Sequence, residues 1–387
     1  MEFQRAINKT LILMIFILMT NASCKNKVGK VIIPEYANHK VNFHIVDSTV
    51  YIGNKDSIFS QLFPVKIDNE ESQVHYDWMT KKIFEFKKSG ATEFYIKKIY
   101  NIKNNFEKYP GFVSKMGGVV AIDSTMYLLI SEPYSLLVDK NFKLIQKITS
   151  NVNSQSRLYH RAGNINHIIY DSKRKSIFFP VFPDLPPTHE DYFKEGRIAE
   201  LNWKRNTTHL LPLGLPPDYL QGIDYQLFSI PLMTTIDNIL IYIYPGSNYL
   251  FAFNLQTNEL SSVLIKPQHV NDIFTKEIGN QPGDAFFSLF ECNNFYRIMN
   301  VNENILLFYW EGKNRDSISE RIGFNHLNCY VLSYSFKSNK ILFDIPVDIS
   351  GVNNNPVFAK NEMLYFQKNY DLENKNIKTT FLHLKLE

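Results

Sequence analysis

Two stretches far apart in the chain, VDSTVYI at residues 46–52 and IDSTMYL at residues 122–128, repeat one pattern. In each, a polar turn of Asp, Ser and Thr is followed at once by aromatic or β-branched residues, which favour strands. A short apolar segment precedes most such turns, so each repeat predicts a β-hairpin. Weaker copies bring the number of predicted hairpins to six, at 170–179, 236–243, 301–309 and 360–367.

A second turn flanked by strands follows each of the first five hairpins, at 74–87, 135–148, 198–213, 250–265 and 330–347. Two hairpins supply the four antiparallel strands of one propeller blade. The sixth unit ends with 381–387, one strand short, while the apolar segment 30–35 (KVIIPE) lies unpartnered before the first unit. We therefore predict an all-β domain over 30–387: a six-bladed β-propeller closed by pairing of 30–35 with the last blade. A seven-bladed closure and a sandwich or jelly roll are the alternatives.

The N-terminus carries an export signal. A nine-residue apolar run, LILMIFILM at 11–19, follows Arg5 and Lys9 and is too short to span a membrane. Small residues then lead to Cys24, an arrangement that resembles the lipobox of bacterial lipoproteins, although Asn21 stands where a lipobox usually has Leu. The resemblance implies a signal peptide over 1–23, lipidation (palmitate) of Cys24, a short tether over 24–29 and attachment to a membrane. An ordinary secretory signal is the alternative.

The whole layout resembles the uncharacterised propeller-like lipoproteins of Bacteroidetes-type bacteria. The resemblance rests on Cys24 with its signal and on the six-unit pattern, and it covers nearly the whole mature chain. It implies an outer-membrane lipoprotein of the cell envelope with a binding role. Lysines rather than acidic residues follow the cysteine, at Lys25 and Lys27, which favours the periplasm-facing leaflet.

Composition excludes one class of partner. Hydrophobic residues make up 44% of the 387, and aromatic residues 14%, which suits a strand-rich core. The net charge is only +4, from 42 basic and 38 acidic residues, so nothing supports nucleic-acid binding. Cys292 and Cys329 remain after the lipobox cysteine, and their spacing fits no zinc signature. Two separate buried thiols and a disulfide both stay open.

Candidate ligand-binding residues lie in the loops expected at one mouth of the channel, because loops held by rigid sheets often carry function. Arg157 and Arg161 could grip a carboxylate or phosphate while Tyr159 stacks on it, with His160 beside them. Pairing of these arginines with nearby acids is the alternative. Three further candidates on this mouth are Glu132, Asp284 and Arg297.

No catalytic residue can be assigned from a motif, because HExxH, CxxC, Gly-x-Ser-x-Gly and phosphate-binding glycine loops are missing. His189, Glu190 and Asp191 are of metal-ligand type, but three adjacent residues cannot all reach one ion unaided. No cofactor is evident, and Ca²⁺ on the propeller axis stays open.

Two functions compete. We favour a binding or scaffold module for a peptide, glycan or partner protein, and leave catalysis open. The alternative is a metal-assisted hydrolase or lyase at the channel mouth. Convergence of three or more of five residues near the axis would favour the enzyme: Glu132, His160, Asp224, Asp284 and Arg297.

Overall fold

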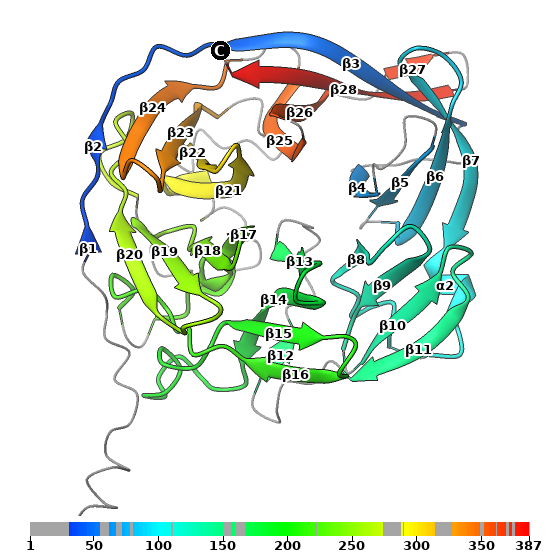
Figure 1. Ribbon diagram of the computed structural model, residues 1–387, viewed down its shortest axis with the longest axis horizontal. Helices are drawn as coiled ribbons and strands as arrows, with labels where there is room; N and C mark the ends of the chain where they lie inside the picture. The colour runs from blue at the N-terminus through cyan, green and yellow to red at the C-terminus, as the bar shows by residue number, and fades with distance from the viewer. Residues whose placement is uncertain are drawn as a thin grey trace, which may run out of the picture.

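The chain folds into β-sheets arranged in a ring, seen end-on in Figure 1. The computed structural model describes residues 31–54, 62–66, 72–77, 80–109, 111–132, 134–149, 156–158, 167–220, 223–273, 288, 290–313, 327–348, 352–360, 362–368, 371–373 and 376–386. The helical elements within these ranges are short and include α2 (Ile102–Asn105) and a 3-10 turn (Gln226–Ser229). No helix in this part of the chain is long and apolar enough to cross a membrane.

Four of the sheets follow one another along the chain. The second-sheet strands are β8 (Gly118–Ala121), β9 (Met126–Ile130), β10 (Tyr134–Asp139) and β11 (Leu144–Thr149). The third-sheet strands are β12 (Ser156–Leu158), β13 (Ile169–Asp171), β14 (Ser176–Pro183), β15 (Ile198–Asn202) and β16 (Thr207–Leu210). The fourth-sheet strands are β17 (Leu232–Ile236), β18 (Ile239–Ile243), β19 (Tyr249–Asn254) and β20 (Leu260–Leu264), with β1 (Val31–Ile32) on the edge. The fifth-sheet strands are β21 (Asn294–Val301), β22 (Asn304–Trp310), β23 (Cys329–Ser335) and β24 (Lys340–Pro346), with β2 (Glu35–Tyr36) on the edge.

The remaining sheet, which we call the first sheet, joins the two ends of the chain. Its N-terminal strands are β3 (Phe43–Asn54), β4 (Leu62–Lys66), β5 (Ser72–Asp77), β6 (Lys82–Lys88) and β7 (Glu93–Asn101). Its C-terminal strands are β25 (Val352–Lys360), β26 (Met363–Lys368), β27 (Asp371–Glu373) and β28 (Asn376–Leu386). All nine are hydrogen-bonded into one sheet.

The prediction of six four-stranded blades is therefore wrong, and the ring is a five-bladed propeller. The segments assigned to the first and sixth units belong to one nine-stranded sheet, because β3 pairs with β28 on one side and with β7 on the other. The β3–β7 pairing is parallel and joins residues 50–52 to residues 93–95. At 12 residues, β3 is long enough to pair with both neighbours.

The other predicted hairpins are confirmed. The five later copies of the repeat form the antiparallel pairs β8–β9, β13–β14, β17–β18, β21–β22 and β25–β26. The first copy is different, because 43–54 is one continuous strand and its Asp47–Ser48 step forms no turn. The register between β3 and β28 shifts by one residue here, because His383 pairs with Asp47 whereas Leu384 pairs with Ile45. The polar residues thus lie at a local irregularity of a continuous strand and not in a turn.

The predicted closing strand is also wrong. Val31–Ile32 pairs in parallel with β20, and Glu35–Tyr36 pairs in parallel with β24. These two strands, which we call the N-terminal strap, place Ile32 and Tyr36 against the core of the fourth and fifth sheets. The ring is sealed instead by β3, which pairs antiparallel with β28 through eleven residue pairs. We call this pairing the seam.

An aromatic cluster packs against the seam. Tyr51 of β3 and Phe381 of β28 are buried, and their ring centroids lie 5.3 Å apart in an edge-to-face arrangement. His75 of β5 is fully buried in the same cluster, with its ring centroid 4.6 Å from that of Tyr51. Edge-to-face contacts of this kind stabilise the cluster beyond the burial of apolar surface, and they favour one relative orientation of the rings.

The first prediction concerns the seam. Phe381→Ala should lower the free energy of unfolding by about 3–5 kcal/mol, because it leaves a cavity in a packed aromatic cluster. Ile45→Ala, at a 61% exposed position on β3, should change it by less than about 0.5 kcal/mol. Urea denaturation measures both. Equal effects of the two substitutions would show that the seam is not a packed interface.

The second prediction concerns acid. Burial lowers the pKa of His75 to about 3, from 6.5. The unfolded chain therefore takes up a proton near pH 6.5 that the folded protein resists, so stability falls as the pH drops from 6.5 towards 3. The expected contribution of His75 to the slope inside this window is about 1.4 kcal/mol per pH unit. Since other buried histidines add to the total, His75→Gln should reduce the slope by about this amount in urea titrations between pH 7 and 4.5, and an unchanged slope would contradict the assignment.

Candidate functional site

Two pockets between neighbouring sheets share one arrangement of charged side chains. In each, a glutamate on one strand pairs with a basic residue on the next strand of the same sheet. Glu85 of β6 contacts Lys97 of β7, with the carboxylate oxygen 2.6 Å from Nζ. Glu200 of β15 lies opposite His209 of β16, with a carboxylate oxygen 3.1 Å from Nε2. The following sheet supplies the other wall of each pocket.

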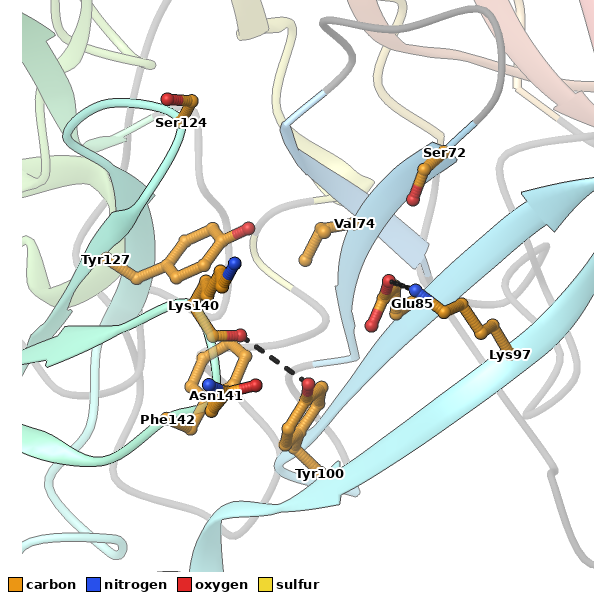
Figure 2. A pocket seen from close by; sticks show the side chains of 10 residues that line it. All are labelled: Ser72, Val74, Glu85, Lys97, Tyr100, Ser124, Tyr127, Lys140, Asn141 and Phe142. Atoms are coloured by element: carbon orange, nitrogen blue, oxygen red, sulfur yellow. Dashed lines mark hydrogen bonds and ion pairs between the residues drawn. The ribbon is translucent and has the colours of Figure 1, made fainter.

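The first of these, which we call the Glu85 pocket, lies between the β4–β7 strands and the second sheet (Figure 2). Its volume is about 350 Å³. The rings of Tyr127 and Phe142 stack with centroids 5.0 Å apart on the second-sheet side. Across from them, the Tyr100 hydroxyl donates to the backbone carbonyl of Lys140 at 3.5 Å. The pocket therefore combines aromatic rings with polar and charged groups.

The second, which we call the Glu200 pocket, lies between the third and fourth sheets and has a volume of about 540 Å³. The side chain of Glu200 is only 8% exposed, and Arg174 Nε lies 3.8 Å from one of its oxygens. Arg174 Nη2 also donates to the carbonyl of Leu255 in the neighbouring sheet at 3.1 Å. One guanidinium thus contacts both walls of the pocket.

Two hairpin turns place the basic residues of the Glu200 pocket. In the β13–β14 turn, the Asp171 carboxylate accepts the backbone N–H groups of Lys173 and Arg174 at 2.9 and 3.1 Å. In the β15–β16 turn, the Asn202 side-chain oxygen accepts the N–H of Arg205 at 3.0 Å. The amide nitrogen of Asn202 also donates to the carbonyl of Arg174 at 3.2 Å, so the two turns are tied together. Asp and Asn suit these positions because their short side chains cap the local backbone.

The lining of the Glu200 pocket carries more positive than negative charge. Lys173, Arg174 and Arg205 line it, and Glu200 is the only acidic residue among its described lining residues. Lys173 has an ion pair with Asp237 at 3.8 Å, but both side chains are more than three-quarters exposed, so this pair contributes little. The pocket is thus electropositive around one buried carboxylate.

A third pocket, of about 580 Å³, is apolar and lies next to the N-terminal strap. Phe193, Tyr242, Phe251 and Leu260 line it together with Val31 of β1. The rings of Tyr242 and Phe251 stack with centroids 4.9 Å apart. Like the Glu200 pocket, it has walls from the third-sheet and fourth-sheet regions, but the two pockets have no lining residue in common.

Of the residues predicted at the channel mouth, Arg297 is the best defined. It lies in β21 and is fully buried. Its charge acts on His167, whose ring nitrogen Nδ1 lies 2.8 Å from the carbonyl of Pro231. Burial, supported by the nearby Arg297 and opposed by the hydrogen bond to Pro231, lowers the pKa of His167 to about 4. The imidazole is therefore neutral at physiological pH.

A second buried arginine, Arg197, was missed by sequence reasoning. Its side chain is fully buried, with Nη2 donating to the carbonyl of Tyr192 at 2.8 Å and the guanidinium 4.3 Å from the Tyr192 ring centroid. Asp224 lies close enough to Tyr192 to help burial raise its pKa, although Arg197 opposes this effect. Glu132 lies in the short link between β9 and β10, two residues after the end of β9.

The other predicted ligand-binding residues lie outside the described residues: Tyr159, His160, Arg161 and Asp284. Arg157 is described only as part of β12, opposite Phe182. Cys24 also lies outside. The proposed convergence of five residues at the axis therefore stays a prediction. Among the residues that the structure does describe, no group of three His, Cys, Asp or Glu could hold a metal ion.

The two remaining cysteines are both buried, and neither forms a disulfide. They belong to different hydrophobic clusters, Cys292 with the fourth sheet and Cys329 with the fifth. Burial raises the pKa of Cys329 to about 12, so its thiol is protonated and unreactive at neutral pH. The structure contains two separate thiols here rather than a disulfide.

Comparisons with known proteins place the fold but not the activity. No protein-family model matches the chain, and no curated protein matches it. A member of the DUF4221 family from Bacteroides vulgatus has a similar structure, with a TM-score of 0.68 at 14% identity, over 90% of this chain and 99% of that one. A predicted exported protein from Bacteroides fragilis superimposes with a TM-score of 0.52 at 8% identity, over 92% of this chain and all of that one. The β-propeller fold is thus shared with uncharacterised Bacteroides proteins.

Proposed function

We propose that this chain is a lipid-anchored binding protein of the cell envelope that holds a small polar ligand between its sheets. The observation that carries the proposal is the repeated construction of the Glu85 and Glu200 pockets, each with a glutamate and a base on adjacent strands. Their volumes, about 350 and 540 Å³, lie within the range of about 300–1,000 Å³ that ligand sites occupy. Charged groups fixed by a rigid sheet need little reordering on binding.

The location follows from two lines of support. The apolar run at 11–19 and the small residues before Cys24 resemble a lipobox, and the similar Bacteroides fragilis protein is predicted to be exported. We place the protein at the outer membrane, facing the periplasm, with the lipid on Cys24. Peptides and glycans are the ligand classes that such a location offers.

The third prediction tests the anchor. Cells grown with labelled palmitate should incorporate label into the wild-type chain but not into Cys24→Ala, because the variant lacks the thiol proposed to carry the lipid. The wild type should sediment with membranes, and the variant should be released as a folded protein. Cys292→Ala controls for other thiol chemistry, since that side chain is buried. Equal labelling of Cys24→Ala would contradict lipidation at this residue.

The fourth prediction tests binding in the two pockets. In thermal-shift screens of neutral sugars, acidic sugars and short peptides, a ligand that binds the native state raises Tm. Thr207→Trp should remove that rise by filling the Glu200 pocket, and Ser124→Trp should do the same for the Glu85 pocket. Each filled variant controls for the other, and Lys204→Trp fills neither. A ligand that protects all three variants equally binds elsewhere, which would contradict the proposed site.

A further inference from the structure

We infer that the Glu200 pocket binds an acidic sugar, a polyhydroxylated ligand that carries a carboxylate. This assignment rests on the proposed binding function and names the ligand class of one of its two pockets. The two pockets differ in charge: the Glu85 pocket sets two lysines against one glutamate, whereas the Glu200 pocket adds arginines that can pair with a carboxylate through two N–H groups.

The cations of the pocket attract a negatively charged group. Lys173, Arg174 and Arg205 line the space, and Glu200 is the one acidic residue among the lining residues that the structure describes. Arg174 is held in place from two sides, by the Leu255 carbonyl at 3.1 Å and the Glu200 carboxylate at 3.8 Å. Arg205 and Lys173 come from separate turns, which the Asn202 amide ties to one another. A ligand carboxylate therefore meets one anchored guanidinium, that of Arg174, with Arg205 and Lys173 on the two turns beside it.

The buried carboxylate of Glu200 restricts which anion fits. An ionised carboxylate only accepts hydrogen bonds, and it has about four lone-pair sites. Within the pocket, His209 at 3.1 Å and Arg174 at 3.8 Å are its ion-pair partners, and its side chain is 8% exposed. A simple anion places a second negative charge near the Glu200 carboxylate and offers it few hydrogen-bond donors. A sugar acid brings its charge to the cations and its hydroxyl groups to Glu200.

The remaining polar lining suits hydroxyl groups. Asn202, Thr207 and Asn258 line the pocket, and amide or hydroxyl side chains both donate and accept. Phe253 and Leu255 form an apolar wall from the fourth sheet, against which the C–H face of a sugar ring can pack. Figure 1 shows the third and fourth sheets as neighbours in the ring, β15 and β16 belonging to one and β19 and β20 to the other.

The experiment measures binding of glucuronate, glucose and inorganic phosphate to the purified Cys24→Ala protein by calorimetry and thermal shift. Glucuronate should bind, and both glucose and phosphate should bind at least about tenfold more weakly, because each lacks one of the two recognised features. Rising salt should weaken glucuronate binding by screening the cations.

The neighbouring residues Arg205 and Lys204 provide a matched pair in one turn, since only Arg205 lines the pocket. Arg205→Ala should weaken glucuronate binding about tenfold or more, and Lys204→Ala should leave it unchanged. The Tm without ligand shows that both variants are folded, and Arg205→Lys should restore part of the binding. Equal loss in Arg205→Ala and Lys204→Ala would overturn the assignment.

Other outcomes separate this inference from the proposed function. If phosphate or glucose binds as tightly as glucuronate, the acidic-sugar assignment is wrong. If a neutral sugar or peptide protects the wild type and Thr207→Trp abolishes that protection, the protein is a binding protein for another ligand class. If no member of the panel binds either pocket, both proposals are wrong.

Discussion

The pairing of β3 with β28 is the constraint on which the rest of the structure depends. It joins residues 43–54 to residues 376–386, almost the full length of the chain apart, through eleven residue pairs. Bringing such distant segments together costs loop-closure entropy, which the buried aromatic cluster around Tyr51 and Phe381 offsets. Without this pairing, two long strands would expose unpaired edges to other chains.

The pockets inherit their geometry from that closed ring. Each pocket has walls from two sheets, so its width is set by how neighbouring sheets pack rather than by any single hairpin. Arg174 illustrates the dependence, because it contacts Glu200 in its own sheet and the Leu255 carbonyl in the next. Because the spacing between the sheets is fixed by the closed ring, a side chain such as Arg174 can be held by one contact to each sheet.

Local patterns in the sequence predicted most hairpins, because a polar turn between apolar strands determines its own pairing. They failed where pairing is between distant segments. Strand-forming residues occur both in 30–35 and in 43–54, and nothing in either segment specifies its partner. Because Asp47–Ser48 was interpreted as a turn, β3 was divided into two short strands. Its pairing with both β28 and β7 was therefore missed, and the predicted count was six units rather than five.

The Glu85 and Glu200 pockets were not predicted, because their walls depend on which sheets lie next to one another. The basic turns at 173–175 and 203–205 are visible in the sequence, but only the fold shows that they lie side by side and face Glu200. Glu200 itself sits in an ordinary strand pattern, so its burial could not be foreseen. The mouth residues Arg297 and His167 do come close together, although sequence reasoning named only the first.

The N-terminal strap has a mechanical consequence if Cys24 carries the lipid that we propose. A pull on the chain upstream of Val31 reaches the two residue pairs between β1 and β20 first, and then the two between β2 and β24. The hydrogen bonds from Tyr36 to the Lys266 carbonyl and to Asp344 add to this second attachment. Two backbone hydrogen bonds follow, from the N–H groups of Ala37 and His39 to the carbonyls of Ile341 and Leu342. A load on the chain therefore reaches β3, and with it the seam, only after all of these contacts have been broken.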